Sequence, residues 1–201
     1  MSADKETREK LIDSARREFM EKGYNKASLR KICADAGVTT GALYFFFEDK
    51  EALFGAIVDE PYNELIAILK SHFEEDEALM EQPYDAVEGD HDAFVEELVH
   101  HLYQNYDVFH MLLTKAQGSK YENAADDLAD ILDETYTKMS AKMGSHYGGK
   151  VNKAMVHWLT HMILDAFIHM ITYEKDEKKA LAHIKKVMNF ITKGWTAVID
   201  K

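Results

Sequence analysis

Two short helical segments joined by a single glycine constrain the fold of this chain more than any other feature. Residues 28–50 read SLRKICADAGVTTGALYFFFEDK. Ser28 is a favoured helix N-cap, and Gly37 can adopt the left-handed backbone conformation that ends a helix sharply. A further helix is expected to begin near Thr39 or Thr40. The sequence therefore predicts two helices that meet at a tight turn.

Helical periodicity extends on both sides of this pair. Residues 4–22 carry apolar side chains at helical spacing, and Gly23 follows as a helix-ending residue. Asp49 is placed to cap a long helix over residues 50–81. Pro61 lies inside that helix and is expected to kink or break it, because proline lacks the backbone N–H.

The remainder of the chain also favours helices. It has only two prolines and no run of alternating β-branched residues. Residues 83–89 are expected to form a loop, and Ser119 with Glu122 matches a capping box. The chain is thus predicted to be all-α with about nine helices, the later ones over residues 90–106, 107–117, 119–143, 150–173 and 176–199.

Charge divides the chain unevenly. The formal net charge is -12, yet residues 1–50 carry +1 and residues 51–201 carry -13. Contact with phosphate needs local cations rather than a basic whole protein. The expected domains are therefore residues 1–50, which could face nucleic acid, and residues 51–201, which nucleic acid would repel.

Several classes of protein are disfavoured by what the sequence lacks. No apolar stretch is expected to reach the roughly 18 residues that a membrane span needs. The N-terminus is charged throughout, which argues against a secretory signal. Cys33 is the single cysteine, which suits a reducing compartment and a buried apolar role. No phosphate-binding glycine loop or nucleophile motif is present. We expect a cytoplasmic chain with no membrane partner, no cofactor and no enzymatic activity.

Two short helices joined by a glycine turn form a helix-turn-helix, whose second helix can enter the DNA major groove. Residues 7–54 resemble the DNA-binding domain of the tetracycline-repressor (TetR) family. The residues that carry the resemblance are Ala15, Phe19, Gly23, Tyr24, Ser28, Ile32, Ala36, Gly37, Val38, Gly41, Leu43, Tyr44, Phe47, Lys50, Glu51, Leu53 and Phe54.

The resemblance implies a homodimer with an all-helical C-terminal domain that usually binds a small molecule. In this family the last two helices pair across the dimer, and ligand binding moves the fourth helix and releases the operator. The implied function is a repressor of transcription that binds a palindromic DNA operator. Apolar stripes on the last two predicted helices agree with a dimer: Met155, Leu159, Met162, Ala166 and Met170 on one, and Leu181, Ile184, Val187, Ile191, Trp195 and Val198 on the other.

The candidate DNA-binding residues fall into two groups. Those expected in the groove are Thr39, Thr40, Gly41, Tyr44 and Phe45, and those expected on phosphates are Lys26, Arg30, Lys31 and Lys50. The third helix has no exposed Arg, Lys, Asn or Gln, the side chains that make the usual bidentate base contacts. Phe45 and Phe46 stand where the family commonly has His or Tyr. Base recognition should therefore depend on threonine hydroxyls, thymine methyl groups and groove shape.

The C-terminal region holds many aromatic and methionine side chains, most of which should form helical core. Polar-tipped candidates for a ligand pocket are Tyr103, His110, Gln117, Tyr136, Trp158 and His161. His157, His161 and Asp165 share one helix face at intervals of four, so a metal-dependent sensor or enzyme is one alternative. An interaction protein that keeps the fold without specific DNA binding is the other.

Overall fold

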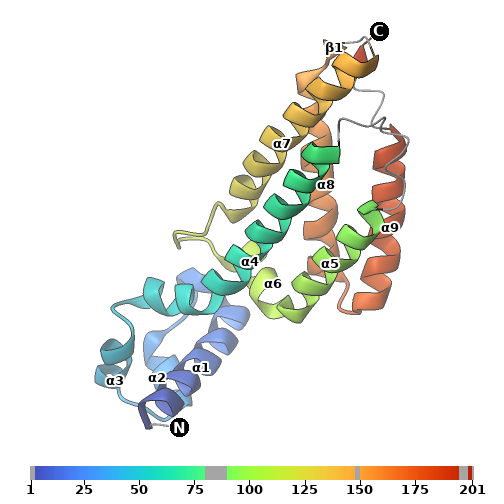
Figure 1. The fold of residues 1–201 in the computed structure, drawn as a ribbon. Helices are drawn as coiled ribbons and strands as arrows, with labels where there is room; N and C mark the ends of the chain where they lie inside the picture. Colours follow the sequence, from blue (N-terminus) through green and yellow to red (C-terminus); the bar gives the residue numbers. More distant parts are fainter. Residues whose placement is uncertain (1–2, 80–89, 148–149, 195–198, 201) are drawn as a thin grey trace. The chain divides into compact units, whose positions relative to one another are not determined.

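The computed structural model describes residues 3–79, 90–147, 150–194 and 199–200. Within these ranges the chain forms nine helices and one two-residue antiparallel ladder (Figure 1), which confirms the all-α prediction. The chain divides into two compact units. Unit 1 comprises Met1–Glu64 and Asn105–Ala124, and unit 2 comprises Leu65–Gln104 and Ala125–Lys201. The sequence did not anticipate that a later segment would join the N-terminal helices.

Unit 1 is built on a small apolar core. Its helices are α1 (Ala3–Lys26), α2 (Leu29–Ala36), α3 (Thr40–Phe46), the first part of α4 (Lys50–Leu79) and α6 (Tyr106–Lys115). The side chains of Phe19, Ile32, Leu43 and Phe54 are fully buried. The rings of Phe19 and Phe54 meet edge to face at 5.0 Å. This core fixes the angle between α1, α2 and α3.

Gly23 interrupts the helical geometry of α1. Its φ of 73° and ψ of 164° lie in a region that is essentially restricted to glycine. The regular helix therefore ends at Lys22, as predicted, because Gly23 has non-helical backbone angles. Helical hydrogen bonding resumes after Gly23 and extends to Lys26.

α6 packs against α1 inside unit 1. The Lys115 ammonium donates a hydrogen bond to the backbone carbonyl of Met20. The turn after α6 differs from the sequence prediction, because α7 (Ala124–Tyr147) begins at Ala124 rather than at Ser119. The buried Ser119 hydroxyl donates to the Ala116 carbonyl at 2.7 Å and accepts from the backbone N–H of Tyr121 at 3.1 Å. The capping-box prediction is wrong because this serine stabilises a local turn instead.

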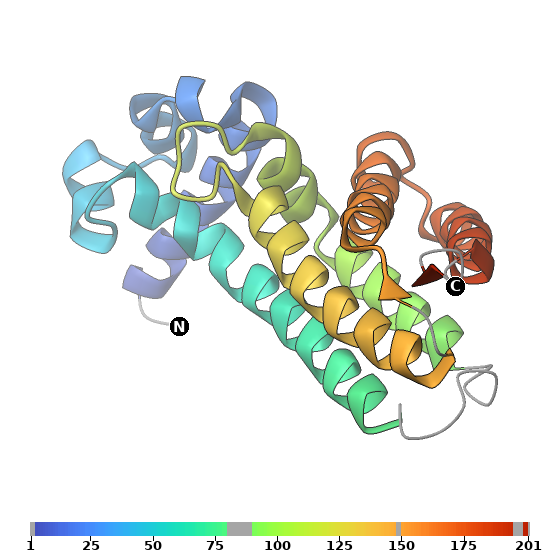
Figure 2. The same cartoon turned by 90° about the horizontal axis from the view of Figure 1, so that it is seen from above.

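Unit 2 is a helical bundle. It contains the end of α4, α5 (Asp90–Gln104), α7, α8 (Lys153–Tyr173) and α9 (Glu177–Gly194). α9 contacts both α5 and α8, and α4 lies beside α7 in both Figures 1 and 2. The strands β1 (Lys150–Val151) and β2 (Ile199–Asp200) pair antiparallel. Ile199 therefore lies in a strand, whereas the sequence predicted that the last helix would extend to residue 199.

Two expectations about single elements need correction. Of the two effects expected of Pro61, a kink or a break, the break does not occur, because α4 runs from Lys50 to Leu79 as one helix. The two units divide after Glu64, three residues beyond Pro61. α8 is long and apolar enough, by length and composition alone, to cross a membrane, with a mean hydropathy of 1.3. Core helices of soluble proteins pass the same test. The predicted loop at residues 83–89 and the stripe residues Trp195 and Val198 lie outside the described residues.

Candidate nucleic-acid interface

The turn between α2 and α3 has the geometry that the sequence predicts. The Ser28 hydroxyl caps α2 by accepting from the backbone N–H of Lys31 at 3.4 Å. Gly37 takes φ 69° and ψ 30°, and the Val38 N–H donates to the Cys33 carbonyl at 2.9 Å. These bonds satisfy the carbonyls at the end of α2 and reverse the chain toward α3.

Two buried polar side chains on α1 hold α2 in place, and neither was predicted from the sequence. The Ser14 hydroxyl donates to the Ile32 carbonyl at 2.9 Å. The carboxylate of Glu18, which is only 4% exposed, accepts from the backbone N–H of Ser28 at 3.1 Å. Polar residues within the inner face of α1 were the available signal, because a buried carboxylate requires a hydrogen-bonding partner.

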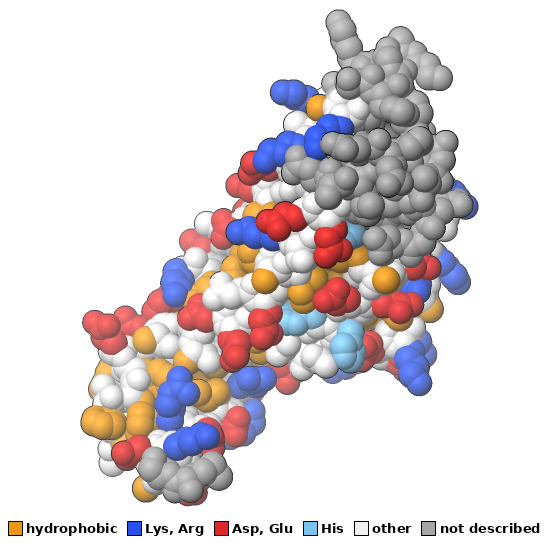
Figure 3. Space-filling view, in the orientation of Figure 1, with side chains coloured by type: hydrophobic (Ala, Val, Ile, Leu, Met, Phe, Trp, Pro, Cys, Tyr) orange, Lys and Arg blue, Asp and Glu red, His pale blue; other side chains and the backbone are white. Residues whose placement is uncertain are grey.

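α3 presents a face that is exposed although it is largely apolar. Leu43 and Phe47 are buried and anchor the helix, whereas Tyr44 is 54% and Phe45 is 75% exposed. Hydrophobic side chains are visible at the surface over α3 in Figure 3, with lysine or arginine side chains beside them. The Thr39 hydroxyl accepts from the backbone N–H of Ala42 at 3.2 Å and so caps α3. Thr39 therefore has a structural role in addition to its expected place in the groove.

The remaining groove candidates, Thr40 and Gly41, are also exposed. The five predicted groove residues thus lie together at the start and along the outer face of α3. A short helix with a fixed angle, a capped N-terminus and an exposed face can contact the floor of the DNA major groove.

The four predicted phosphate-binding cations differ in availability. Lys26 and Arg30 are exposed. Lys31 forms an exposed ion pair with Asp35 at 2.7 Å, which a phosphate could replace at little cost because such surface pairs are weak.

Lys50 is held more firmly than the other three cations. Its ammonium donates to the Asn25 carbonyl at 3.3 Å and lies 4.7 Å from the centre of the Tyr24 ring. Burial lowers the pKa of Lys50 below its usual value. This lysine therefore stabilises the junction of α1 and α4 as well as adding positive charge.

Cys33 is buried within the same small core at 3% exposure. Burial raises the pKa of its thiol, so the reactive thiolate is disfavoured. The prediction that Cys33 serves as a buried apolar residue is therefore confirmed in its location.

The segment that follows α6 is joined to α4 through two carboxylates. Glu51 accepts from the Tyr24 hydroxyl at 2.9 Å and from the backbone N–H of Lys120 at 3.2 Å. Asp59 accepts a hydrogen bond from the Tyr121 hydroxyl. The beginning of α4 is thus tied both to α1 and to the turn before α7.

The six predicted pocket residues are divided between the two units. His110 and Gln117 belong to unit 1, and the other four belong to unit 2. The Tyr103 hydroxyl donates to the Glu174 carbonyl at 2.7 Å, and the Tyr136 ring meets the Phe73 ring at 5.8 Å. Trp158 is 68% exposed, and the ring of His161 lies 4.5 Å from that of His157.

The alternative metal site receives no support from the described residues. His157 Nδ1 lies 2.5 Å from an Asp133 carboxylate oxygen, and Asp165 is exposed one turn beyond His161. Within the part of the chain that the structure describes, no three His, Cys, Asp or Glu side chains come together in a way that could hold a metal ion.

Comparison with known proteins identifies the N-terminal helices. Residues 11–57 match the model of the bacterial regulatory proteins of the tetR family. The transcriptional repressor BepR of Brucella suis is 47% identical over 53 residues, which cover 26% of this chain and 25% of BepR. The repressor Rv1474c of Mycobacterium tuberculosis is 39% identical over 61 residues, which cover 30% of this chain and 33% of that protein. The match to these relatives thus spans a quarter to a third of their length.

The fold resemblance extends over almost the whole chain. A crystal structure of a transcriptional regulator from Aquifex aeolicus superimposes with a TM-score of 0.60 and 20% identity, covering 92% of this chain and 99% of the other. At this level of identity the similarity establishes the fold of both units.

Proposed function

We propose that this chain is a homodimeric, DNA-binding transcriptional regulator, because residues 11–57 match the model of the tetR family of bacterial regulatory proteins. The relatives BepR and Rv1474c are both transcriptional repressors. The proposed activity is repression, relieved when a small molecule binds unit 2, in a cytoplasmic protein. The single observation that carries the proposal is the exposed outer face of α3 on a rigid, capped helix-turn-helix.

The groove contacts proposed for this face are the hydroxyl of Thr40, the backbone at Gly41 and the rings of Tyr44 and Phe45. Thr39 would contribute from the N-terminus of α3. Lys26 and Arg30 would bind flanking phosphates, with Lys31 exchanging its partner Asp35 for DNA.

A dimer is supported by apolar side chains that remain exposed on α8 and α9. Trp158 and Met162 are 68% and 47% exposed on α8, and Val187 and Phe190 are 38% and 74% exposed on α9. Exposed apolar side chains that share a helix face mark interaction surfaces. A two-fold dimer would place two copies of α3 on the two halves of a palindromic operator.

Selection from random duplexes tests the DNA-binding proposal. The full-length protein is incubated with a random duplex library at moderate salt, and bound DNA is sequenced over several rounds. Enrichment of a palindrome with half-sites separated by about one helical turn is expected. A triple variant, Thr40→Ala, Tyr44→Ala and Phe45→Ala, is the comparison, since these exposed side chains contribute little to folding.

The outcomes separate a regulator from an interaction protein that has the same fold. Loss of the enriched palindrome in the triple variant, with unchanged helical content, supports the assignment of α3. If the unaltered protein enriches no duplex at all, the DNA-binding proposal is wrong.

A further inference from the structure

We propose that a groove between α4 and α7 binds an anion with an apolar body, such as a fatty carboxylate. The groove lies wholly within unit 2 and has a volume of about 430 Å³. Sites for small molecules typically enclose about 300–1,000 Å³. The inference rests on the proposed function only in giving this ligand a regulatory role, because binding itself is independent of DNA.

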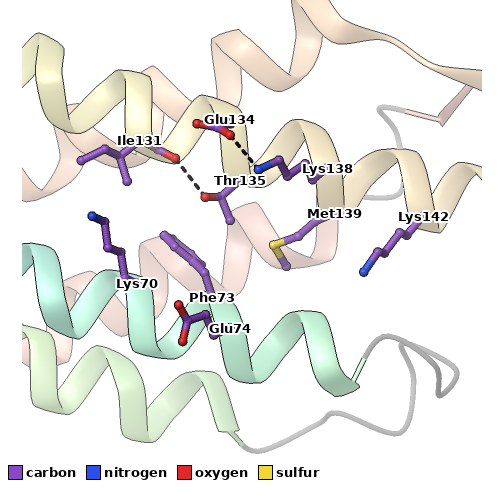
Figure 4. A pocket seen from close by; sticks show the side chains of 9 residues that line it. All are labelled: Lys70, Phe73, Glu74, Ile131, Glu134, Thr135, Lys138, Met139 and Lys142. Atoms are coloured by element: carbon purple, nitrogen blue, oxygen red, sulfur yellow. Dashed lines mark hydrogen bonds and ion pairs between the residues drawn. The ribbon is translucent and has the colours of Figure 1, made fainter.

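The floor of the groove is apolar. Phe73 comes from α4, and Ile131 and Met139 come from α7. Figure 4 shows the Phe73 ring pointing from α4 toward α7. The Thr135 hydroxyl donates to the Ile131 carbonyl at 2.9 Å, so its proton is used within its own helix. A hydrocarbon chain or ring on this floor would be removed from water without displacing a polar contact.

The rim carries more positive than negative charge. Lys138 is paired with Glu134 at 2.7 Å on the α7 side. The whole lining contains three lysines, Lys70, Lys138 and Lys142, against two carboxylates, Glu74 and Glu134. This is a local excess of cations in a region, residues 51–201, whose formal net charge is -13.

Lys70 provides the most specific signal. Among the described residues it makes no hydrogen bond or ion pair. Figure 4 shows its side chain extending from α4 toward Ile131, at the opposite end of the groove from Lys142. A lysine stem can lie along apolar surface while its ammonium remains available to a charged partner. A fatty carboxylate would place its hydrocarbon body on Phe73 and its carboxylate group on the Lys70 ammonium.

Direct calorimetric titration of the full-length protein, without DNA, tests this inference. The probes are octanoate, decanoate, 1-decanol and decyltrimethylammonium. Decanoate is expected to bind at one site per protein chain. Its affinity should exceed that of octanoate by roughly fourfold for each added methylene group that the groove covers. The neutral alcohol should bind about tenfold more weakly, because it lacks the charge that meets Lys70.

Variants at Lys70 locate the binding site. Lys70→Gln should weaken decanoate binding about tenfold, and Lys70→Glu should reverse the preference toward decyltrimethylammonium. The matched control is Lys178→Gln, which removes an exposed lysine from α9 outside the groove and should leave decanoate binding unchanged.

Three results would overturn the inference. They are no binding of decanoate, equal affinity for the three ten-carbon probes, and decanoate affinity that does not depend on Lys70. Each can be observed while duplex selection still yields a palindrome, which would leave the regulator assignment in place. Conversely, failure of duplex selection would not alter the calorimetric result.

Discussion

Phe45 places an apolar ring where a DNA-reading side chain is expected. It is 75% exposed on α3 and packs edge to face with Phe46 at 4.9 Å. In the major groove the one apolar feature of a base pair is the thymine methyl group. We predict that Phe45 recognises thymine, so that replacing the contacted thymine by uracil weakens binding of the unaltered protein about fourfold.

The variant Phe45→Ala provides the control for that prediction. It should bind the thymine and uracil duplexes with equal affinity, since the side chain that senses the methyl group is gone. Its free energy of unfolding should change by less than about 0.5 kcal/mol, as expected for an exposed position. Fluorescence anisotropy on the selected operator measures both duplexes, and a uracil effect that persists in Phe45→Ala would assign the methyl contact elsewhere.

Gly23 has a backbone conformation that disfavours other amino acids. Its φ of 73° with ψ of 164° is strained for any side chain, and a Cβ there would lie 3.4 Å from the Lys115 carbonyl oxygen. Gly23→Ala should lower the free energy of unfolding by about 1–3 kcal/mol. Gly41→Ala is the matched control, because a Cβ at Gly41 meets only Thr39 Oγ1 at 3.8 Å inside a helix, where alanine is preferred. Urea denaturation followed by circular dichroism compares them, and equal stability of the two variants would contradict the prediction.

At the residue scale, the sequence predicted local contacts much better than distant ones. Ser28, Gly37 and Asp49 act on backbone groups within a few positions, and each has its predicted role. Glu18 could not be assigned, because its partner, the Ser28 N–H, lies ten positions away and becomes adjacent only when α1 and α2 pack. The exposed apolar character of Phe45 could be predicted because α3 is short and its inner face is already occupied by Leu43 and Phe47.

Two tyrosines connect separate elements of unit 1 and give the unit an alkaline pH dependence. Burial, followed by the hydrogen bond to Glu51, raises the pKa of Tyr24 to about 12, and burial with Asp59 raises the pKa of Tyr121. In the unfolded chain both hydroxyls ionise near pH 10. Between pH 10 and 12 the unfolded state therefore binds fewer protons than the folded state, and the stability that is present below pH 10 falls as pH rises.

The corresponding substitutions test this link between elements. Tyr24→Phe and Tyr121→Phe should each cost about 1 kcal/mol at pH 8 and should reduce the loss of stability between pH 10 and 12. Tyr44→Phe is the control, because it removes a solvent-exposed hydroxyl from α3. Urea midpoints measured at pH 8, 10 and 11.5 give the stability at pH 8 and its loss at alkaline pH. If a variant with both Tyr24→Phe and Tyr121→Phe loses stability above pH 10 as steeply as the unaltered protein, the two tyrosines do not cause the alkaline pH dependence.

At the element scale, the sequence predicted helix identity well and helix boundaries less well. The predicted helices starting at residues 50 and 90 begin where expected, whereas α7 starts at Ala124 and not at Ser119. The capping-box pattern failed because Ser119 is buried and forms a turn with Ala116. The placement of α6 in unit 1 could not be foreseen, since it depends on contacts with α1 about 90 residues away.

At the scale of the whole molecule, the two units separate two kinds of chemistry. Unit 1 exposes the α3 face with its adjacent cations and ties α4 to α1 and to the turn after α6 through Glu51. Unit 2 contains the other part of α4, which contributes Lys70 and Phe73 to the groove. If the proposed function holds, the continuous helix α4 would be the physical link through which a ligand bound in unit 2 changes the affinity of unit 1 for DNA.

The proposed dimer also concerns the whole molecule, and Phe190 is well placed to test it. It is 74% exposed on α9, one turn from Val187, while Ile184 and Ile191 face the interior. Phe190→Glu would place a charge in the proposed subunit interface, which should weaken the dimer by about 3 kcal/mol, on the order of a hundredfold. Lys178→Glu changes an already exposed lysine of α9 to an acidic residue and should leave the dimer intact. Sedimentation at micromolar concentration measures the oligomer. A monomer carries only one α3, so Phe190→Glu should also lose affinity for a palindrome while retaining weak binding to a half-site. If Phe190→Glu stays dimeric, the subunit interface lies away from this face of α9.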